Sequence, residues 1–184
     1  MPRAGLTPDT VIDHAVRLID AAGPEAVTLA AVAARAGVAT PSLYKHVGSL
    51  AQLRTLVSAR VLEEVAQRTG RAVQGRSGDA ALAAFLHAYR SYVRDHPHRY
   101  AALRQQPDPA LESAAGRLLD VLLAVLYGFG LHGSDAIHAA RCLRSAAHGF
   151  AVLEASGGFG LPEDLDASYA VLVQTLTTGL PRTP

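Results

Sequence analysis

Residues 28–46 (TLAAVAARAGVATPSLYKH) constrain the fold of this chain most, because they read as two short helices joined by a glycine turn. Ala33 stands where two crossing helices leave room only for a small side chain. Gly37, four residues later, can adopt the left-handed conformation that such a turn needs. Thr40 offers an N-cap and Pro41 a pre-set first helical residue for the second helix. The pattern is typical of a helix-turn-helix that reads DNA.

The second helix of this pair combines a polar face with an aliphatic one. A hydroxyl, a phenol, an ammonium and an imidazole occur within five residues, whereas Leu43 and Val47, four residues apart, share the inward face. A helix that enters a DNA groove needs hydrogen-bonding groups outside and aliphatic side chains inside. Two helices joined by a glycine also occur in helical hairpins that bind nothing, so the DNA-binding prediction depends on the polar side chains. These are Ser42, Tyr44, Lys45 and His46.

Length and composition favour a globular protein that needs no metal or disulfide to hold its core. The chain has 184 residues, of which 49% are hydrophobic. Its lone cysteine, Cys142, allows no internal disulfide and fits a reducing compartment. No signal-peptide pattern opens the sequence, and its most apolar run, residues 118–131, is too short to span a bilayer. We therefore expect a soluble, cytoplasmic protein.

The distribution of charge, rather than the net charge, agrees with DNA binding. The whole chain carries a formal net charge of only +1. Residues 1–78 hold nine Lys or Arg against six Asp or Glu, whereas residues 79–184 hold eight against ten. The positive excess therefore lies with the helix-turn-helix. Because this excess is small, tight binding requires two copies whose phosphate contacts add.

Helical segments on both sides of the hairpin complete the N-terminal domain. An apolar stripe predicts a helix over residues 7–22. Thr28 is expected to cap the next helix, and its hydroxyl with the free amides beside it could hold a phosphate. Ser49 is expected to cap a longer helix over about 49–70. We expect this helix to link a helix-turn-helix domain, residues 1–68, to the rest of the chain.

Every segment after the glycine-containing stretch 69–78 again looks helical. Ser134 is the expected cap of the second-last helix. There is no run of alternating strand-like residues and no internal repeat. The prediction is an all-α fold with a second helical domain over residues 79–180. Its expected helices cover about 79–96, 98–103, from the corner at 107–109 to 127, 134–156 and 164–178.

The last two long helices, about 134–156 and 164–178, predict a dimer interface. Small residues on the first let a neighbouring helix approach closely, and the second adds apolar bulk, so two copies could form an isologous four-helix interface. The same residues could instead fill the core of the monomer. They are Ala139, Ala140, Leu143, Ala146, Ala147, Gly149, Phe150, Tyr169, Leu172, Val173 and Leu176.

At this point the residues support a resemblance to a family. The string from Gly37 to Val47 resembles the Gly-Val-x-x-x-x-Leu-Tyr-x-His-Phe signature of the tetracycline-repressor (TetR) family of bacterial transcriptional regulators, with Val47 in place of Phe. The later residues resemble the subgroup whose C-terminal domain is named for Trp, His and Gly, although this chain contains no Trp. Arg144 stands near the place of that Trp, and Leu50 stands where relatives often carry a phosphate-binding Lys. The later residues in question are Tyr89, Arg90, His96, Pro97, Tyr100, 148–150 and 157–160.

The resemblance implies a homodimeric regulator, by family habit a repressor, that binds a palindromic DNA operator. The second helix of the hairpin carries Lys45 but no Arg, so it lacks the bidentate contact to guanine, and we expect more dependence on DNA shape. The residues at positions that contact DNA in relatives are Thr28, Thr40, Pro41, Ser42, Tyr44, Lys45 and His46.

The resemblance also implies a small-molecule pocket in the C-terminal domain, whose occupancy changes the spacing of the two DNA-binding domains. As a set, the candidate residues suggest a mostly apolar effector held by one or two hydrogen bonds. Each residue taken alone is better explained as plain core. The candidates are Tyr89, Tyr92, Tyr100, Leu103, Leu118, Leu122, His138, Cys142 and Ser145.

The alternative class is a helical enzyme or metal protein whose hairpin only imitates a DNA reader. His138 and Cys142 lie four residues apart, a spacing that two metal ligands on one helix can have, but no third ligand stands at a convincing position. The sequence contains no nucleophile elbow, phosphate loop, His-Glu-x-x-His pair or Cys-x-x-Cys motif. We therefore expect no catalysis, no metal and no cofactor.

Overall fold

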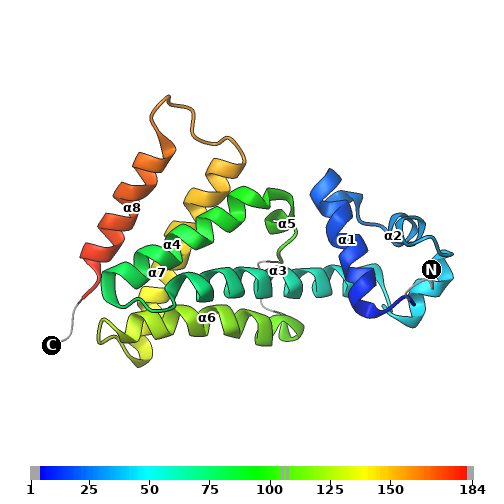
Figure 1. Cartoon of the computed structure of the whole chain (residues 1–184), viewed down its shortest axis with the longest axis horizontal. Coiled ribbons are helices and arrows are strands. Elements are labelled where there is room, and N and C mark those ends of the chain that lie inside the picture. The colour runs from blue at the N-terminus through cyan, green and yellow to red at the C-terminus, as the bar shows by residue number, and fades with distance from the viewer. Residues whose placement is uncertain (1–4, 105, 107, 182–184) are drawn as a thin grey trace. The chain divides into compact units, whose positions relative to one another are not determined.

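The computed structural model describes residues 5–104, 106 and 108–181, so Pro107 of the expected corner and residues 1–4 of the expected first domain lie outside the described residues. Every regular element in these ranges is a helix, which confirms the all-α prediction (Figure 1). None of these helices is long and apolar enough to cross a bilayer. The α-helices are α1 (Pro8–Ala22), α2 (Leu29–Ala36), α3 (Leu50–Val73), α4 (Gly78–Asp95), α5 (Pro97–Ala101), α6 (Glu112–Tyr127), α7 (Gly133–Ala155) and α8 (Leu165–Gly179). Three short 3₁₀ helices accompany them, η1 (Pro24–Ala26), η2 (Thr40–Lys45) and η3 (Pro109–Leu111).

The described residues form two compact units. The N-terminal unit contains the chain up to Leu62 together with His98–Ser113. The C-terminal unit contains Glu63–Pro97 and the chain from Ala114 onward. Helix α3 carries the chain from the first unit into the second.

In the N-terminal unit, α1 packs against α2, and α2 packs against η2. The core is made of small and aliphatic side chains, with Val11, Val32 and Leu43 completely buried and Ala33 only 1% exposed. Gly37 ends α2 in the left-handed conformation, with φ 68° and ψ 32°, as the turn requires. The two elements of the predicted hairpin are therefore present, and their order and turn are as expected.

Three hydroxyl caps confirm where the helices of this unit begin. In each case the side-chain oxygen accepts a hydrogen bond from an amide in the first turn, which satisfies a donor that the helix itself leaves free. The pairs are Thr7 with the Thr10 amide at 3.2 Å, Thr28 with the Ala31 amide at 3.1 Å and Ser49 with the Gln52 amide at 3.0 Å.

Two predicted caps are wrong. The cap of η2 is Ala39, which has extended dihedrals of −74° and 143°, and Thr40 is already the first helical residue. The Ser42 amide donates to the Ala39 carbonyl at 2.9 Å, so the Thr40 hydroxyl is not needed there. Helix α7 begins at Gly133 after the extended His132, so Ser134 lies inside the helix and caps nothing. In both places the helix begins at an earlier residue than the capping residue types predict, because the residue before it already has an extended backbone.

In the C-terminal unit, α4 packs against α7 and α8. Five of the small and apolar residues predicted for a dimer interface are buried in this unit's own core, namely Ala140, Leu143, Ala147, Tyr169 and Val173. The others are at least half-buried, and they include Ala146, Gly149, Leu172 and Leu176. For the five buried residues the core reading is correct, and the dimer interface stays a prediction for the others.

Candidate DNA-binding surface and C-terminal groove

The short helix η2 presents its polar side chains outward. Leu43 and Val47 are 0% and 1% exposed, so they hold this segment against the core. Tyr44, by contrast, is 57% exposed. The remaining residues predicted to contact DNA from this segment are exposed or half-buried, and they are Thr40, Pro41, Ser42, Lys45 and His46.

The polar groups of this segment are not used by the protein itself. Among the described residues, none accepts or donates a side-chain hydrogen bond to the five polar side chains, and none forms an ion pair with Lys45. Folded proteins usually satisfy polar groups internally or leave them to water. Five uncommitted hydrogen-bonding side chains on one short helix therefore form a surface suited to a polar partner. They are Thr40, Ser42, Tyr44, Lys45 and His46.

Thr28 is exposed at the start of α2, and its hydroxyl already accepts the Ala31 amide at 3.1 Å. A hydroxyl that accepts a hydrogen bond still has its own O–H to donate. The cap thus fixes the side chain while leaving a donor directed away from the helix. This arrangement suits a phosphate oxygen at a helix N-terminus.

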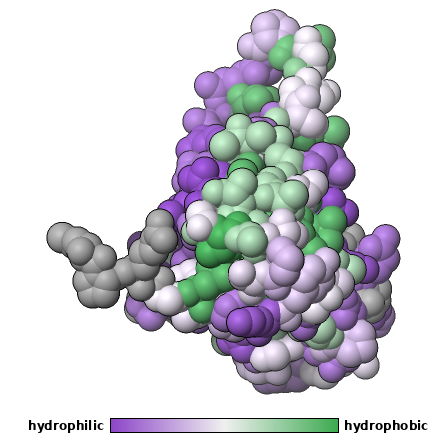
Figure 2. All heavy atoms as spheres, turned by 90° about the vertical axis from the view of Figure 1, so that its right-hand side faces the viewer, coloured by the Kyte–Doolittle hydropathy of each residue, from purple (hydrophilic) through white to green (hydrophobic). Residues whose placement is uncertain are grey.

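The sequence reasoning missed two cations of this unit, Arg17 and Arg35. Both are exposed, and neither forms an ion pair with a described residue. Two acidic residues near Arg17 in the sequence, by contrast, are paired with another arginine, since Arg60 lies 2.8 Å from Asp13 and 3.2 Å from Asp9. Arg35 lies in the last turn of α2, directly before the predicted turn, and that position was the available signal. In Figure 2 the visible side of the molecule is a mixture of hydrophilic and hydrophobic residues, and neither kind covers it alone.

The residues predicted to contact a ligand do not share one site. Tyr89, Tyr92 and Leu122 are buried at 5%, 2% and 4% exposure. The Tyr92 hydroxyl donates to Glu64 at 2.6 Å. Leu118 is half-buried in α6, whereas His138, Cys142 and Ser145 are exposed on α7. Tyr100 and Leu103, a buried and a half-buried residue, belong to the N-terminal unit.

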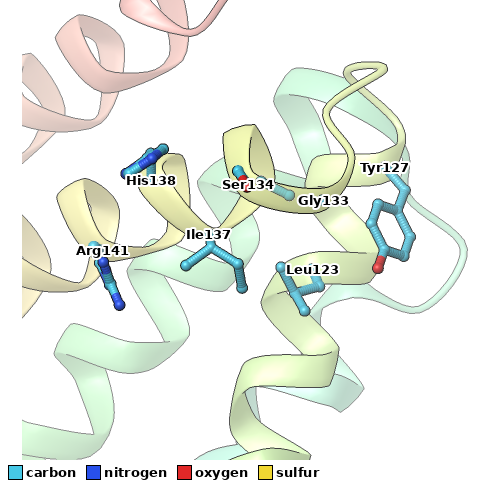
Figure 3. A pocket seen from close by; sticks show the side chains of 8 residues that line it. Leu123, Tyr127, Gly133, Ser134, Ile137, His138 and Arg141 are labelled. Atoms are coloured by element: carbon cyan, nitrogen blue, oxygen red, sulfur yellow. The ribbon is translucent and has the colours of Figure 1, made fainter.

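One groove, with a volume of about 510 Å³, lies in the C-terminal unit where the end of α6 meets the start of α7 (Figure 3). Of the predicted ligand residues, only His138 lines it. Its apolar wall comes from residues that the sequence reasoning did not select, because the ends of two helices meet only in the folded chain. The lining consists of Leu123, Tyr127, Gly133, Ser134, Ala136, Ile137, His138 and Arg141.

Comparison with known families matches most of the chain. The N-terminal family described as bacterial regulatory proteins, tetR family, matches residues 11–54. The family described as tetracyclin repressor-like, C-terminal domain, matches residues 82–176. The chain belongs to the TetR family. The Trp-His-Gly subgroup remains a prediction.

Two curated relatives agree with this membership. An uncharacterized HTH-type transcriptional regulator of Mycobacterium tuberculosis, Rv0681, is 36% identical over 97% of this chain and 84% of its own length. An uncharacterized HTH-type transcriptional regulator of Bacillus subtilis, YobS, is 34% identical over 97% of this chain and 95% of its own length. This TetR-family chain is thus a DNA-binding transcriptional regulator of bacterial type.

Solved structures show the same fold. A protein of unknown function from Rhodococcus sp. RHA1 superposes with a TM-score of 0.82 at 21% identity, over 97% of each chain. A TetR variant from Acinetobacter baumannii AYE, in complex with minocycline, gives 0.72 at 18% identity over 95% of this chain and 96% of that one. The regulator FadR from Bacillus subtilis, in complex with stearoyl-CoA, gives 0.70 at 17% identity over 93% and 98%. At these identities the likeness concerns the fold.

The C-terminal unit of this TetR-family chain is held together by a buried arginine. Arg90 is 5% exposed; its Nε and Nη2 donate to the two carboxylate oxygens of Glu154 at 2.6 and 2.7 Å. Its Nη1 donates to Asp166 at 2.7 Å, and its guanidinium lies 4.6 Å from the ring centroid of Tyr169. The hydrogen bonds to Glu154 raise the pKa of Arg90, and burial raises the pKa of Tyr169. One side chain therefore joins α4, α7 and the first turn of α8.

Metal binding was weighed for His138 and Cys142. Within the part of the chain that the structure describes, no group of three or more His, Cys, Asp or Glu side chains could hold a metal ion. His148, on the same helix, is half-buried. Its burial and the charge of Arg144 lower its pKa, which favours the neutral imidazole.

Proposed function

We propose that this chain is a homodimeric repressor that binds a palindromic operator and is released by a small, mostly apolar effector. The observation that carries the DNA-binding part is η2, where five polar side chains are uncommitted and the aliphatic ones are buried. The family membership supports transcriptional regulation as the purpose of that surface.

The chemistry of the surface assigns a role to each predicted contact. Tyr44 and His46 donate to phosphate oxygens, and Lys45 supplies positive charge to the backbone or to guanine acceptors. Thr40 and Ser42 reach base edges, while Pro41 offers an apolar contact to a thymine methyl group. Thr28 donates its free O–H to a phosphate. To these seven residues we add Arg17 and Arg35 as exposed cations for backbone phosphates.

The exposed faces of α7 and α8 support the homodimer. From Ala167 to Leu180, α8 and its C-cap contain no charged residue, although Ala170, Val171 and Gln174 are exposed. Val171 alone is 63% exposed. A helix face that is uncharged and open in a single protomer is typical of a subunit interface. A homodimer that binds a palindrome would present its two η2 helices to successive major grooves, about 34 Å apart.

The effector is inferred to be a small, mostly apolar molecule. Two proteins of the same fold were solved with small molecules, minocycline in one and stearoyl-CoA in the other, which supports a small-molecule effector for this chain. Release would require that the ligand favour a protomer arrangement that no longer fits the operator. Such coupling is typically worth about 1–3 kcal/mol, or a 5- to 150-fold change in DNA affinity.

Selection of genomic DNA fragments by the purified protein tests this function directly. We expect a palindrome whose half-sites are spaced by about one helical turn or somewhat more. A protein carrying both Tyr44→Ala and Lys45→Ala is the matched control, because these exposed side chains form no hydrogen bond or ion pair with the described residues, and it should recover no motif. A folded dimer that recovers no sequence preference would contradict the regulator assignment.

A further inference from the structure

The groove between α6 and α7 has apolar walls and a basic edge. Leu123 and Ile137 project into it from the two helices, and Arg141 lies one turn further along α7 (Figure 3). Arg141 is exposed and forms no ion pair with a described residue. Helix α7, where Ile137 and Arg141 lie, also carries part of the face that we propose for dimerisation. An open apolar groove beside such a face is typical of a surface that binds a partner.

The loop 156–164 between α7 and α8 has the complementary chemistry. Leu161 at its tip is 78% exposed, and Glu163 beside it is exposed with no ion pair to a described residue. The base of the loop is held in place, because the Gly158 amide donates to the Leu153 carbonyl at 2.7 Å and Phe159 packs on Phe150 at 4.8 Å between ring centroids. In Figure 1 the loop forms the turn that closes the α7–α8 hairpin. An apolar tip with an acidic neighbour is thus presented on an anchored loop.

Symmetry brings these two features together. When a two-fold axis runs perpendicular to α7, the two copies of this helix pack antiparallel, so the start of one lies beside the end of the other. The natural crossing point is Gly149, since a Cβ added there would meet no atom within 4 Å in the single protomer. Ile137 lies about 18 Å of helix before Gly149, whereas α7 continues for only about 9 Å beyond it, to Ala155. With the crossing at Gly149, the loop that follows Ala155 needs to extend about 9 Å further along the partner helix to reach the partner's groove.

We propose that Leu161 of each protomer inserts into the α6–α7 groove of its partner, where Glu163 pairs with Arg141 of the partner subunit. The contact rests on the proposed homodimer and is made twice by symmetry. The groove is several times larger than a leucine side chain, which leaves room for the adjoining Pro162. The charges are opposite in sign, and both are unused within the described part of a single protomer, so pairing requires no internal ion pair to break.

Cysteine cross-linking in the full chain tests the contact. In a Cys142→Ser background, Ile137→Cys combined with Leu161→Cys should give covalent dimers under mild oxidation, because a disulfide requires Cα atoms roughly 4.4–6.8 Å apart. A bond within one protomer is precluded, since Ile137 lies about 27 Å of helix before the end of α7. Leu161→Cys combined with Gln67→Cys, an exposed position on α3, is the matched control and should remain uncross-linked.

The outcomes separate this contact from the dimer itself. Sedimentation of the same proteins gives the oligomeric state independently. A stable dimer in which the paired cysteines cross-link no better than the control overturns the loop contact alone, and the groove is then open to a small apolar anion. A monomeric chain overturns the homodimer and the contact together.

A charge exchange tests the ion pair. Glu163→Arg or Arg141→Glu alone should raise the dimer dissociation constant by roughly two- to fivefold per contact, as expected for a surface ion pair. The two changes combined should restore the original value. Failure of the combined variant to recover would overturn the pairing of Glu163 with Arg141.

Discussion

The N-terminal and C-terminal units use their polar residues in opposite ways. On η2 the polar side chains point outward and form no side-chain hydrogen bond with a described residue, whereas in the C-terminal unit Arg90 is buried and its donors are occupied by Glu154 and Asp166. The first arrangement leaves hydrogen-bonding capacity for a partner. In the second arrangement the hydrogen-bond donors are used inside the protein, where they join three helices.

Side chains of the first kind are available to bind a partner, whereas side chains of the second kind stabilise the fold. Substituting an uncommitted surface residue should change binding without changing stability. Substituting the buried guanidinium should change stability first, and any effect on DNA binding should follow from it.

Removal of the Arg90 side chain should be the most damaging change. Arg90→Ala leaves Glu154, whose side chain is only 12% exposed, as a charge without its partner. Breaking one side of a buried pair typically costs about 3–5 kcal/mol. Urea unfolding at fixed protein concentration measures the loss.

Arg94→Ala is the matched control, one turn further along α4. Arg94 is 55% exposed and lies 3.6 Å from the same Asp166, so its loss should cost below about 1 kcal/mol. Equal losses for the two variants would show that burial does not distinguish these arginines, and the contrast between the units would fail.

Local chemistry explains how much of the fold could be predicted. Thr7, Thr28 and Ser49 cap helices as expected, because a cap depends on the few residues around it. Gly37 takes the left-handed turn for the same reason. Thr40 and Ser134 fail as caps, since there the incoming chain is already extended one residue or two residues earlier. Where the backbone conformation of the preceding residues determines the start of a helix, a rule based on capping residue types places that start at the wrong residue.

Sequence separation explains what the site predictions missed. The predicted DNA contacts from Thr40 to His46 span seven consecutive positions, η2 and its C-cap, and could be recognised as a motif. The partners of Arg90, in contrast, are 64 and 76 positions away. The groove likewise joins Leu123 to Arg141 across the turn between two helices. Such sites arise from packing, and a spacing rule on one helix, as used for His138 and Cys142, does not find them.

Lys45→Ala should weaken operator binding while leaving the unfolding free energy unchanged. If Lys45 contacts phosphate, the slope of log affinity against log salt should fall by about one for each half-site, uniformly across operator sequences. Arg71→Ala, which removes an exposed cation on α3, should leave the slope as it is. An unchanged slope for Lys45→Ala would place this residue away from the DNA backbone.

Gly149→Ala should strengthen the protomer and weaken the dimer. A Cβ at Gly149 meets nothing within 4 Å, so alanine should favour α7 by roughly 0.5–1 kcal/mol, yet it fills the proposed crossing point of two helices. Gly116→Ala in α6 has the same open surroundings and should add stability without affecting association. Sedimentation equilibrium compares the two dissociation constants. The same constant for both variants would move the interface away from Gly149.

His148 gives the smallest effect, and it depends on pH. Burial, together with Arg144, lowers its folded pKa below the ordinary value of 6.5, so the unfolded chain binds the proton more readily. The resulting stability is present above pH 6.5 and is lost as the pH falls through the folded pKa. His148→Gln should therefore lose less stability than the parent chain between pH 7.5 and pH 5.5, as measured by urea midpoints at one protein concentration. His87→Gln, which removes an exposed imidazole on α4, is the matched control and should follow the parent. If His148→Gln loses as much stability as the parent over this pH range, the pH dependence of the C-terminal unit comes from groups other than the His148 imidazole.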